Sequence, residues 1–215
     1  MGVRIVLIGF PGVGKLTIAK ELSAMVSAKI VDNHWVNNPI LRLLDEDGTA
    51  PLPKGIWEFT GRVLQTVLDA ITAYAPSANF IFTQAGLEGD ERRPRTFQQI
   101  ASAAEACDAV LVPVRLLCDE EDLARRVSNP ERRQRLKSTD VAASRDRSRR
   151  AGVFDPLHPN TLVLDVTSAS PGKTAIAIRE QILKVLGDLS ARNSSELILF
   201  ALRSSIRLMA GGEAF

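Results

Sequence analysis

The sequence predicts an α/β fold in which a five-stranded parallel sheet is flanked by helices. Two observations support this. Short apolar runs typical of buried strands alternate with longer segments in which apolar residues recur at helical spacing. A glycine-rich turn also lies between the first apolar run and the first helical segment, over Gly9–Lys15. With 215 residues, 45% of them hydrophobic, the chain is large enough for one domain with a real core.

The glycine-rich turn has the spacing GxxxxGK, from Gly9 to Lys15, that is typical of a P-loop. Glycine lets backbone N–H groups curl around a polyphosphate, and the following helix N-terminus adds its positive dipole end. The Lys15 ammonium would reach the terminal phosphates. An ordinary glycine-rich turn is the alternative, but the sequence favours a nucleotide-phosphate site. Its predicted residues are Gly9, Gly12, Val13, Gly14, Lys15, Leu16 and Thr17.

Leu16 departs from the P-loop pattern, in which Ser or Thr at this position binds Mg²⁺. Thr17 lies about 100° further around a helix, so it cannot take over that ligand position. We expect Thr17 to contact the α-phosphate instead. Because Mg²⁺ tolerates a shell made mostly of phosphates and water, we expect ATP and Mg²⁺ as cofactors with no assigned protein ligand for the metal.

Composition and charge narrow the classes of function. Lys and Arg number 27 against 25 Asp and Glu, for a net charge of +2, which favours neither nucleic acid nor membrane. Cys107 and Cys118 lack CxxC spacing, and no secretory signal precedes the first strand, so we expect a cytoplasmic protein. The apolar run Leu197–Leu202 is too short for a bilayer, which needs about 20 apolar residues.

Polar residues follow the second predicted strand, which covers residues 29–31. In parallel sheets ligands bind beyond the carboxyl ends of the strands, so Asp32, Asn33 and His34 are placed to meet a substrate. The alternative for Asp32 and Asn33 is an N-cap of a helix starting at Val36. For His34 a structural role is the favoured interpretation.

Spacing and punctuation predict the remaining elements. We expect helices over 14–28, 38–47, 56–74, 91–106 and 171–186, and strands over 79–83, 109–117 and 161–166. In the helix from Ile56, apolar spacing assigns Phe59 and Tyr74 to the buried side. Arg62 lies on its polar side, where it either meets a bound acceptor or is merely solvated. Pro113 predicts that its strand lies near a sheet edge or carries a bulge.

Gln84 follows the third strand, where P-loop enzymes often carry an Asp that holds magnesium through water. We expect Gln84 to hydrogen-bond water and substrate. Ser170 is a natural N-cap of the last predicted helix, and its loop would border the adenine. The predicted domain covers residues 1–187, followed by a tail over 188–215 with a short amphipathic helix docked on the body or on a second subunit of a homodimer.

Ten basic residues between 125 and 150 predict a lid that closes over the triphosphate. Arg132 and Arg133 are the predicted catalytic members of this lid. The alternatives are a solvated basic face or a nucleic-acid patch. The second is less favoured because no aromatic residues interleave with these bases for stacking.

With the P-loop first, an acid after the second strand and a basic lid before the fifth, the chain resembles P-loop small-molecule and nucleotide kinases. The shikimate kinase and nucleoside monophosphate kinase group is nearest, and the resemblance covers about Val3–Leu186. It implies that Asp32 orients the acceptor hydroxyl and that Arg62 binds an acceptor carboxylate. In the LxxR pattern entering the lid, it implies that Arg126 lies against the adenine.

The resemblance also has departures. Leu16 is one, the repeated glycines after the third strand are missing, and Asn33 with His34 replaces the shikimate-binding pattern. Shikimate is therefore not the predicted acceptor.

The sequence thus favours a cytoplasmic kinase that moves the γ-phosphoryl group of ATP to a hydroxyl or phosphate of a small metabolite. The predicted catalytic residues are Lys15, Asp32, Arg132 and Arg133. Arg126 and Ser170 join the P-loop in binding ATP, and the predicted acceptor-binding residues are Asp32, Asn33, His34, Arg62 and Gln84. A nucleotide-binding regulatory or interaction protein with little or no turnover is the alternative, motivated by Leu16 and Gln84. An RNA-directed protein is a third.

Overall fold

The computed structural model describes residues 1–44, 52–53, 55–127, 142, 145–146, 149 and 151–210, with only the backbone from 193 onward. The chain divides into two compact units, Met1–Arg179 and Glu180–Phe215. The first unit holds the sheet and the candidate site. Within the described ranges, no helix combines the length and apolar character needed to cross a membrane.

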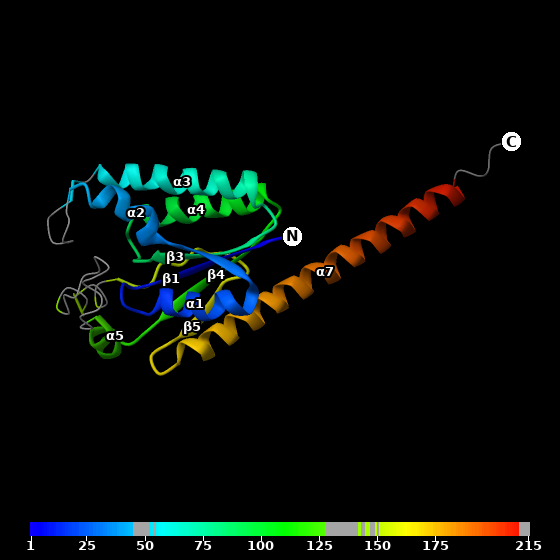
Figure 1. Cartoon of the computed structure of the whole chain (residues 1–215). Coiled ribbons are helices and arrows are strands. Elements are labelled where there is room, and N and C mark those ends of the chain that lie inside the picture. The colour runs from blue at the N-terminus through cyan, green and yellow to red at the C-terminus, as the bar shows by residue number, and fades with distance from the viewer. Residues whose placement is uncertain are drawn as a thin grey trace. The chain divides into compact units, whose positions relative to one another are not determined.

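The first unit is built on five parallel strands in the order β2-β3-β1-β4-β5, which confirms the predicted fold class (Figure 1). The strands are β1 Val3–Gly9, β2 Ala28–Asp32, β3 Asn79–Ala85, β4 Val110–Leu117 and β5 Leu162–Asp165. All seven residues of the central strand β1 are buried. A strand covered by helices on both faces needs a continuous apolar run, because neither set of alternate side chains meets water.

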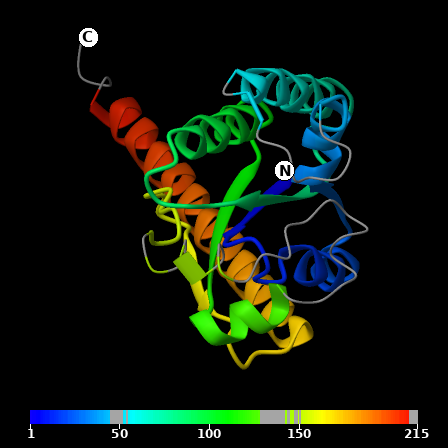
Figure 2. The same ribbon diagram turned by 90° about the vertical axis from the view of Figure 1, so that its left-hand side faces the viewer.

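Helices cover both faces of this sheet. The described helices are α1 Lys15–Val26, α2 Asn33–Leu41, α3 Ile56–Tyr74, α4 Arg92–Ala106, α5 Glu120–Val127 and α7 Pro171–Ala210. Helices α3 and α4 lie on one face and α1 on the other (Figures 1 and 2). The chain moves from β1 to β2 in one direction and from β3 across β1 to β4 in the other. With right-handed crossovers, α1 and α4 therefore fall on opposite faces.

The last helix begins where the sequence predicts but ends much later. The Ser170 hydroxyl accepts a hydrogen bond from the Lys173 N–H at 3.3 Å, which confirms Ser170 as its N-cap. Within the first unit, Ala175 and Ile178 of α7 are buried. The expected stop near residue 186 is wrong, because α7 runs unbroken over 40 residues. The domain boundary near 187 and the homodimer through the tail stay predictions.

Two expectations about the helices after β2 are wrong. Helix α2 begins at Asn33 rather than at Asn38, because Asp32 caps it directly at the end of β2. In α3, Phe59 and Tyr74 are 49% and 89% exposed rather than buried. The buried positions of α3 form a narrow stripe of Thr60, Leu64, Leu68 and Ile71, so apolar residues beside this stripe stay in water.

Pro113 does not mark an edge strand, because β4 lies between β1 and β5. Its local surroundings explain how a residue without an N–H fits there. Pro113 pairs with Val6 of β1, but pairing with β5 starts only at Val114. On the β5 side before that point, the Asn160 side-chain amide donates to the Leu111 carbonyl at 3.0 Å. The missing donor therefore costs no interstrand bond to β5.

Replacing Gly86 by Ala should destabilise the fold. A Cβ at this position would lie 2.3 Å from Ile8 Cγ2 and 3.4 Å from the Phe154 Cβ, so the core must move. Overpacking of this kind costs about 1–3 kcal/mol, which urea unfolding would measure. Gly172→Ala is the matched control, because nothing lies within 4 Å of its added methyl group. Equal unfolding free energies for the two variants would contradict the close packing.

Candidate functional site

The turn between β1 and α1 has two positions with a left-handed backbone, and it leads into a helix N-terminus. Gly12 and Gly14 have φ values of 105° and 101°, in the left-handed region that favours glycine. Gly14 is the N-cap of α1, no side chain caps the helix, and no acidic residue lies in its first turn. Among the described residues, no capping side chain or first-turn acid therefore meets the first N–H groups of α1 and its positive dipole end, which suits them to a phosphate.

Lys15 holds its ammonium group over this turn. Its Nζ donates to the carbonyl oxygens of Gly9 at 2.8 Å and Phe10 at 2.9 Å. Both acceptors belong to the turn itself, so the cation lies where a bound polyphosphate would pass. Of the two residues that follow, Leu16 is half-buried and Thr17 is exposed.

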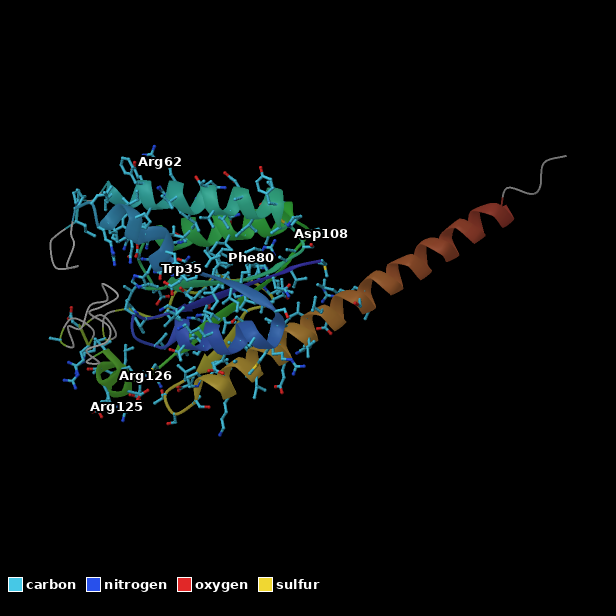
Figure 3. All side chains as sticks on the ribbon, viewed as in Figure 1. Trp35, Arg62, Phe80, Asp108, Arg125 and Arg126 are labelled. Carbon is cyan, nitrogen blue, oxygen red and sulfur yellow. The ribbon has the colours of Figure 1, made fainter. Side chains whose placement is uncertain are left out.

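Arg126 of α5 ties the P-loop to the loop after β5. Its Nη1 donates to the Val13 carbonyl at 3.0 Å, and its Nη2 donates to the carbonyls of Val166 at 2.7 Å and Thr167 at 3.1 Å. An ion pair with Asp122 at 2.6 Å completes its contacts. The guanidinium thus lies between two of the segments predicted to surround the nucleotide, and Figure 3 shows it on α5.

Asp32 ends β2 and is 3% exposed. Its Oδ1 accepts a hydrogen bond from the His34 N–H at 2.8 Å, which confirms the N-cap alternative, although the capped helix starts earlier than expected. The next N–H, of Asn33, donates to the Thr83 hydroxyl at 3.2 Å and joins the ends of β2 and β3. The cap uses one carboxylate oxygen, so it does not exclude a second role for the other.

A cavity of about 560 Å³ opens beyond the ends of β2 and β3, between α2, α3 and α4. Among the predicted acceptor-binding residues, Asn33, Arg62 and Gln84 line it, whereas Asp32 and His34 do not. Gln84 pairs in register with Ile8 of β1, and the next residue of β3 pairs with Gly9. Neighbouring strands lie about 4.8 Å apart, so the cavity wall is one strand away from the P-loop.

No family model and no curated protein matches this sequence. Solved structures with the same fold do match. A gluconokinase from Sinorhizobium meliloti 1021 is 14% identical, with a TM-score of 0.62 over 88% of this chain and 97% of that chain. A sugar kinase from Janibacter sp. HTCC2649 is 18% identical, with a TM-score of 0.57 over 87% and 95%. An APS kinase from Mycobacterium tuberculosis, solved with AMPPNP and APS, is 12% identical, with a TM-score of 0.55 over 84% and 97%.

The chain has the fold of P-loop small-molecule kinases. The resemblance predicted from the sequence is thereby confirmed at the level of the fold. At these identities the match shows the fold and not the roles of individual residues.

The kinase fold of this chain carries an arginine cluster that the sequence reasoning missed. The Asp90 carboxylate accepts from Arg92 Nε and Nη2, both at 2.7 Å, and from Arg93 Nε at 2.9 Å. Both arginines line the cavity, as does Arg95 one residue after Pro94. Basic residues in the first turn of a helix are unfavourable because they lie at the positive end of its dipole. The run of arginines at the start of α4 is the sequence feature that could have revealed the cluster.

Burial and charge act against each other in this cluster. Burial alone would raise the pKa of the Asp90 carboxyl, but the Arg92 hydrogen bonds and the Arg93 charge outweigh it and lower the pKa to about 2. Burial lowers the pKa of the Arg93 guanidinium, and the Asp90 charge works in the opposite direction. The Asp90 carboxyl is therefore ionised at neutral pH.

Two of the cavity arginines, Arg62 and Arg92, differ in their surroundings. Arg62 is exposed on α3 and stacks over the Phe59 ring at 4.3 Å (Figure 3). Arg92 stacks over the Trp57 ring at 4.2 Å while it binds Asp90. The Arg92 guanidinium is held by a ring and a carboxylate together, whereas Arg62 is held by a ring contact at the surface.

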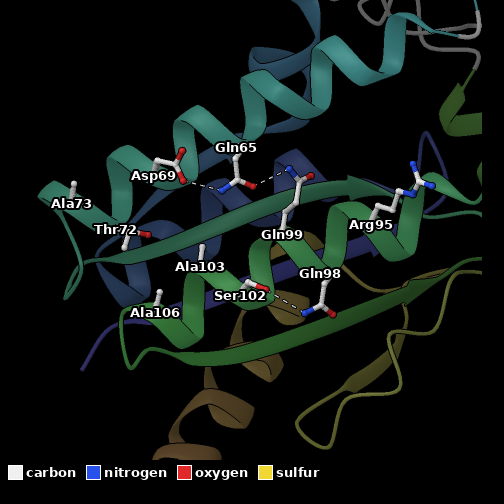
Figure 4. Close-up of a pocket in the computed structure, with 10 residues that line it drawn as sticks. All are labelled: Gln65, Asp69, Thr72, Ala73, Arg95, Gln98, Gln99, Ser102, Ala103 and Ala106. Carbon is white, nitrogen blue, oxygen red and sulfur yellow. Dashed lines mark hydrogen bonds between the residues drawn. The ribbon is translucent and has the colours of Figure 1, made fainter.

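Gln99 sets the spacing of the two helices above the cavity. Its Nε2 donates to the Gly61 carbonyl at 3.2 Å and to Gln65 Oε1 at 3.0 Å, and Gln65 in turn donates to Asp69 at 2.8 Å (Figure 4). A groove of about 680 Å³ runs between α3 and α4. Gln65 and Gln99 line both the cavity and the groove, so their bond lies where the two spaces meet.

The predicted lid falls mostly outside the described residues, and this includes Arg132 and Arg133. Arg149 is described and pairs with Glu120 of α5 at 2.8 Å, and Arg145 lies 3.9 Å from the same carboxylate. In the described ranges, no group of three or more His, Cys, Asp or Glu residues is placed to hold a metal ion.

Asp90→Asn should make stability less sensitive to acid. A carboxyl whose pKa falls from 3.8 to about 2 on folding stabilises the fold above pH 3.8, and this contribution is lost as pH falls toward 2. We expect Asp90→Asn to lower the free energy of unfolding by about 1–3 kcal/mol at pH 7, and by clearly less at pH 3. Urea titrations at both values measure this, with Asp69→Asn on the exposed face of α3 as the control. A pH-independent difference would contradict the ion-pair account.

Proposed function

We propose that this protein is an ATP-dependent phosphotransferase that moves the γ-phosphoryl group of ATP to a hydroxyl or phosphate of a small metabolite. One observation carries the proposal: a phosphate-binding turn on β1 lies one strand away from a cavity of about 560 Å³. That volume lies in the range of small-molecule sites. The fold shared with small-molecule kinases supports the same conclusion.

The donor side is formed by the P-loop and its neighbours. The N–H groups around Gly12 and Gly14 surround the phosphates, and Lys15 exchanges its carbonyl partners for phosphate oxygens. Arg126 holds the turn against the loop after β5, which would border the base together with Ser170. A cytoplasmic setting supplies the ATP.

The acceptor side is the cavity at the ends of β2 and β3. Asn33 and Gln84 offer hydrogen bonds to the acceptor there. The acceptor oxygen attacks the γ-phosphorus as the bond to the β-phosphate oxygen breaks. Asp32 does not line the cavity but directly precedes its wall residue Asn33, and in the proposed reaction it turns its second carboxylate oxygen to the hydroxyl and takes the proton. Most of the rate enhancement comes from positioning the two substrates and from fixed positive charge near the transferred group.

Mg²⁺ would neutralise phosphate charge in such a reaction. The residues of this P-loop do not supply the usual metal ligand, because Leu16 has no side-chain oxygen. The ion would be held by phosphate oxygens and water, and none of the roles proposed above depends on a protein ligand to it.

The same departure favours a second candidate, a nucleotide-binding regulatory or interaction protein with little turnover. Leu16 replaces the metal-binding hydroxyl, and Gln84 follows β3 where an acid is common. ADP release measured with ATP, Mg²⁺ and a panel of nucleosides, sugars, hydroxy acids and aminoglycosides separates the two functions. Stimulation by any acceptor supports the kinase. ATP binding without any stimulation supports the regulatory protein.

Lys15→Ala should weaken ATP binding at least tenfold, because it removes the cation that faces the polyphosphate. Isothermal titration with ATP measures the dissociation constant and needs no acceptor. Lys20→Ala, on the exposed side of the same helix, is the matched control and should bind ATP as the wild type does. Unchanged affinity in Lys15→Ala would refute the role of Lys15.

Asp32→Asn should separate catalysis from capping. An Asn side chain still caps α2, so the free energy of unfolding should stay within about 0.5 kcal/mol of wild type. Stimulated ADP release should fall roughly 100-fold or more, because the amide cannot accept the acceptor proton. Asp32→Ala, which also loses the cap, should cost about 1 kcal/mol in addition. Full turnover in Asp32→Asn would contradict the catalytic role, and Asp32 would then serve only as the cap of α2.

A further inference from the structure

We propose that the acceptor carries an anionic group, a carboxylate or a phosphate ester, that binds the Arg93 guanidinium at the start of α4. This inference rests on the proposed function for the reaction, and it adds the chemical class of the substrate. It is carried by the placement of one half-buried cation in the cavity wall, the Arg93 guanidinium, and by its incomplete hydrogen bonding.

The Arg93 side chain is only 16% exposed, yet it lines the cavity. Within the described part of the chain, its Nε has a hydrogen-bond partner, Asp90, whereas its two Nη nitrogens have none. These Nη donors are accessible rather than buried, so a ligand can reach them, and guanidinium donors match the two oxygens of a carboxylate or phosphate. An anion in the cavity would therefore satisfy donors that the fold leaves unpaired.

The charges around the cavity also favour an anion over a neutral acceptor. Among the described residues four arginines and one glutamate line it: Arg62, Arg92, Arg93, Arg95 and Glu58. The Asp90 carboxylate, which pairs with Arg92 and Arg93, offsets one more of these positive charges. The charge around the cavity is still positive. The N-terminal end of α4 adds its positive dipole to the same wall. A neutral acceptor would leave this field uncompensated.

Arg93 is also the cavity arginine placed closest to the reaction side. It shares a small hollow with Gln84 and Gly86 at the end of β3, which is the strand beside the P-loop strand. Arg92 is already held by Trp57 and Asp90, and Arg95 is exposed. The anion would thus lie on the α4 wall while the reacting hydroxyl of the same molecule faces the end of β2.

The other residues that line the cavity indicate what kind of molecule lies between the anion and the reacting hydroxyl. Val31, Val36 and Leu64 contribute apolar surface, and Trp57 presents a half-buried ring. A molecule with a carbon skeleton, a hydroxyl at one end and an anion at the other matches these surroundings. The Gln65–Gln99 hydrogen bond lies at the side of the cavity between α3 and α4. The cavity volume of about 560 Å³ fits a small metabolite.

The first test measures anion binding directly. Sulfate, inorganic phosphate and acetate are titrated calorimetrically into the protein saturated with AMPPNP, so that the P-loop is filled. We expect at least one of them to bind wild type, and Arg93→Gln to weaken that binding at least tenfold. Arg93→Lys, which keeps the charge but loses the fork, should fall in between. Comparing sulfate and phosphate with acetate separates a phosphate ester from a carboxylate.

Two controls assign the site. Arg179→Gln removes an exposed arginine of α7 outside the cavity and should leave anion affinity within about twofold of wild type. Lys20→Ala, on the exposed side of α1, should also keep the Arg93-dependent binding. Circular dichroism of Arg93→Gln confirms that it is folded, and Arg93→Lys provides a second variant if it is not.

The second test uses turnover with matched acceptors. Glycerate is compared with glycerol, and glucose 6-phosphate with glucose, in ADP release with ATP and Mg²⁺. Stimulation by the anionic member of a pair, lost in Arg93→Gln, supports the proposal. Equal stimulation by the neutral member overturns it.

Binding results can also overturn it. If no anion binds wild type in the presence of AMPPNP, or if Arg93→Gln binds as well as wild type, the proposal is wrong. If Arg93-dependent anion binding is found but ATP does not bind, the kinase function fails while the anion site stands.

Discussion

The candidate site depends on the parallel pairing of β1 with β3 on one side and β4 on the other. In this register Gly9, the first residue of the P-loop, lies beside Ala85 and Leu116. The Gly86 N–H extends the pairing by one residue, donating to the Gly9 carbonyl at 3.2 Å. The glycine-rich turn and the wall of the cavity thus become neighbours through backbone hydrogen bonds alone. A slip of one residue would turn every side chain of β3 to the opposite face and remove Gln84 from the cavity.

Groups that stabilise the fold also prepare the chemistry. Asp32 caps α2 with one oxygen, and the Arg126 guanidinium joins three carbonyls across two loops. Such contacts hold side chains in one orientation before a ligand arrives, which lowers the entropy lost on binding. Two positively charged features still have hydrogen-bond donors that meet no side-chain acceptor among the described residues. One is the uncapped N-terminus of α1, and the other is Arg93, whose Nη donors lack partners among the described residues. Both suit anions, one from the donor and one from the acceptor.

Local features were predicted well from the sequence, and side-chain surroundings were not. Gly12, Gly14 and Lys15 were proposed because the P-loop pattern is a matter of spacing along the chain, and the left-handed φ values of the two glycines agree with it. Phe59 and Tyr74 were placed wrongly, since helical spacing shows which residues share a face but not how wide the buried stripe is. Pro113 was read as an edge signal because the length of β5, which leaves one side of Pro113 unpaired, cannot be seen in the sequence around it.

The sequence by itself determined the sheet class, the P-loop, the acid at the end of β2 and the cap of α7. Each of these is written in neighbouring residues, and short-range sterics and backbone hydrogen bonding are enough to specify it. Only the tertiary structure decided which side chains meet across elements. It brought Arg93 of α4 to the wall that Gln84 and Asn33 share, and it attached Arg126 to the P-loop residue Val13. Contacts between residues distant in sequence depend on packing and strand order, which no local pattern encodes.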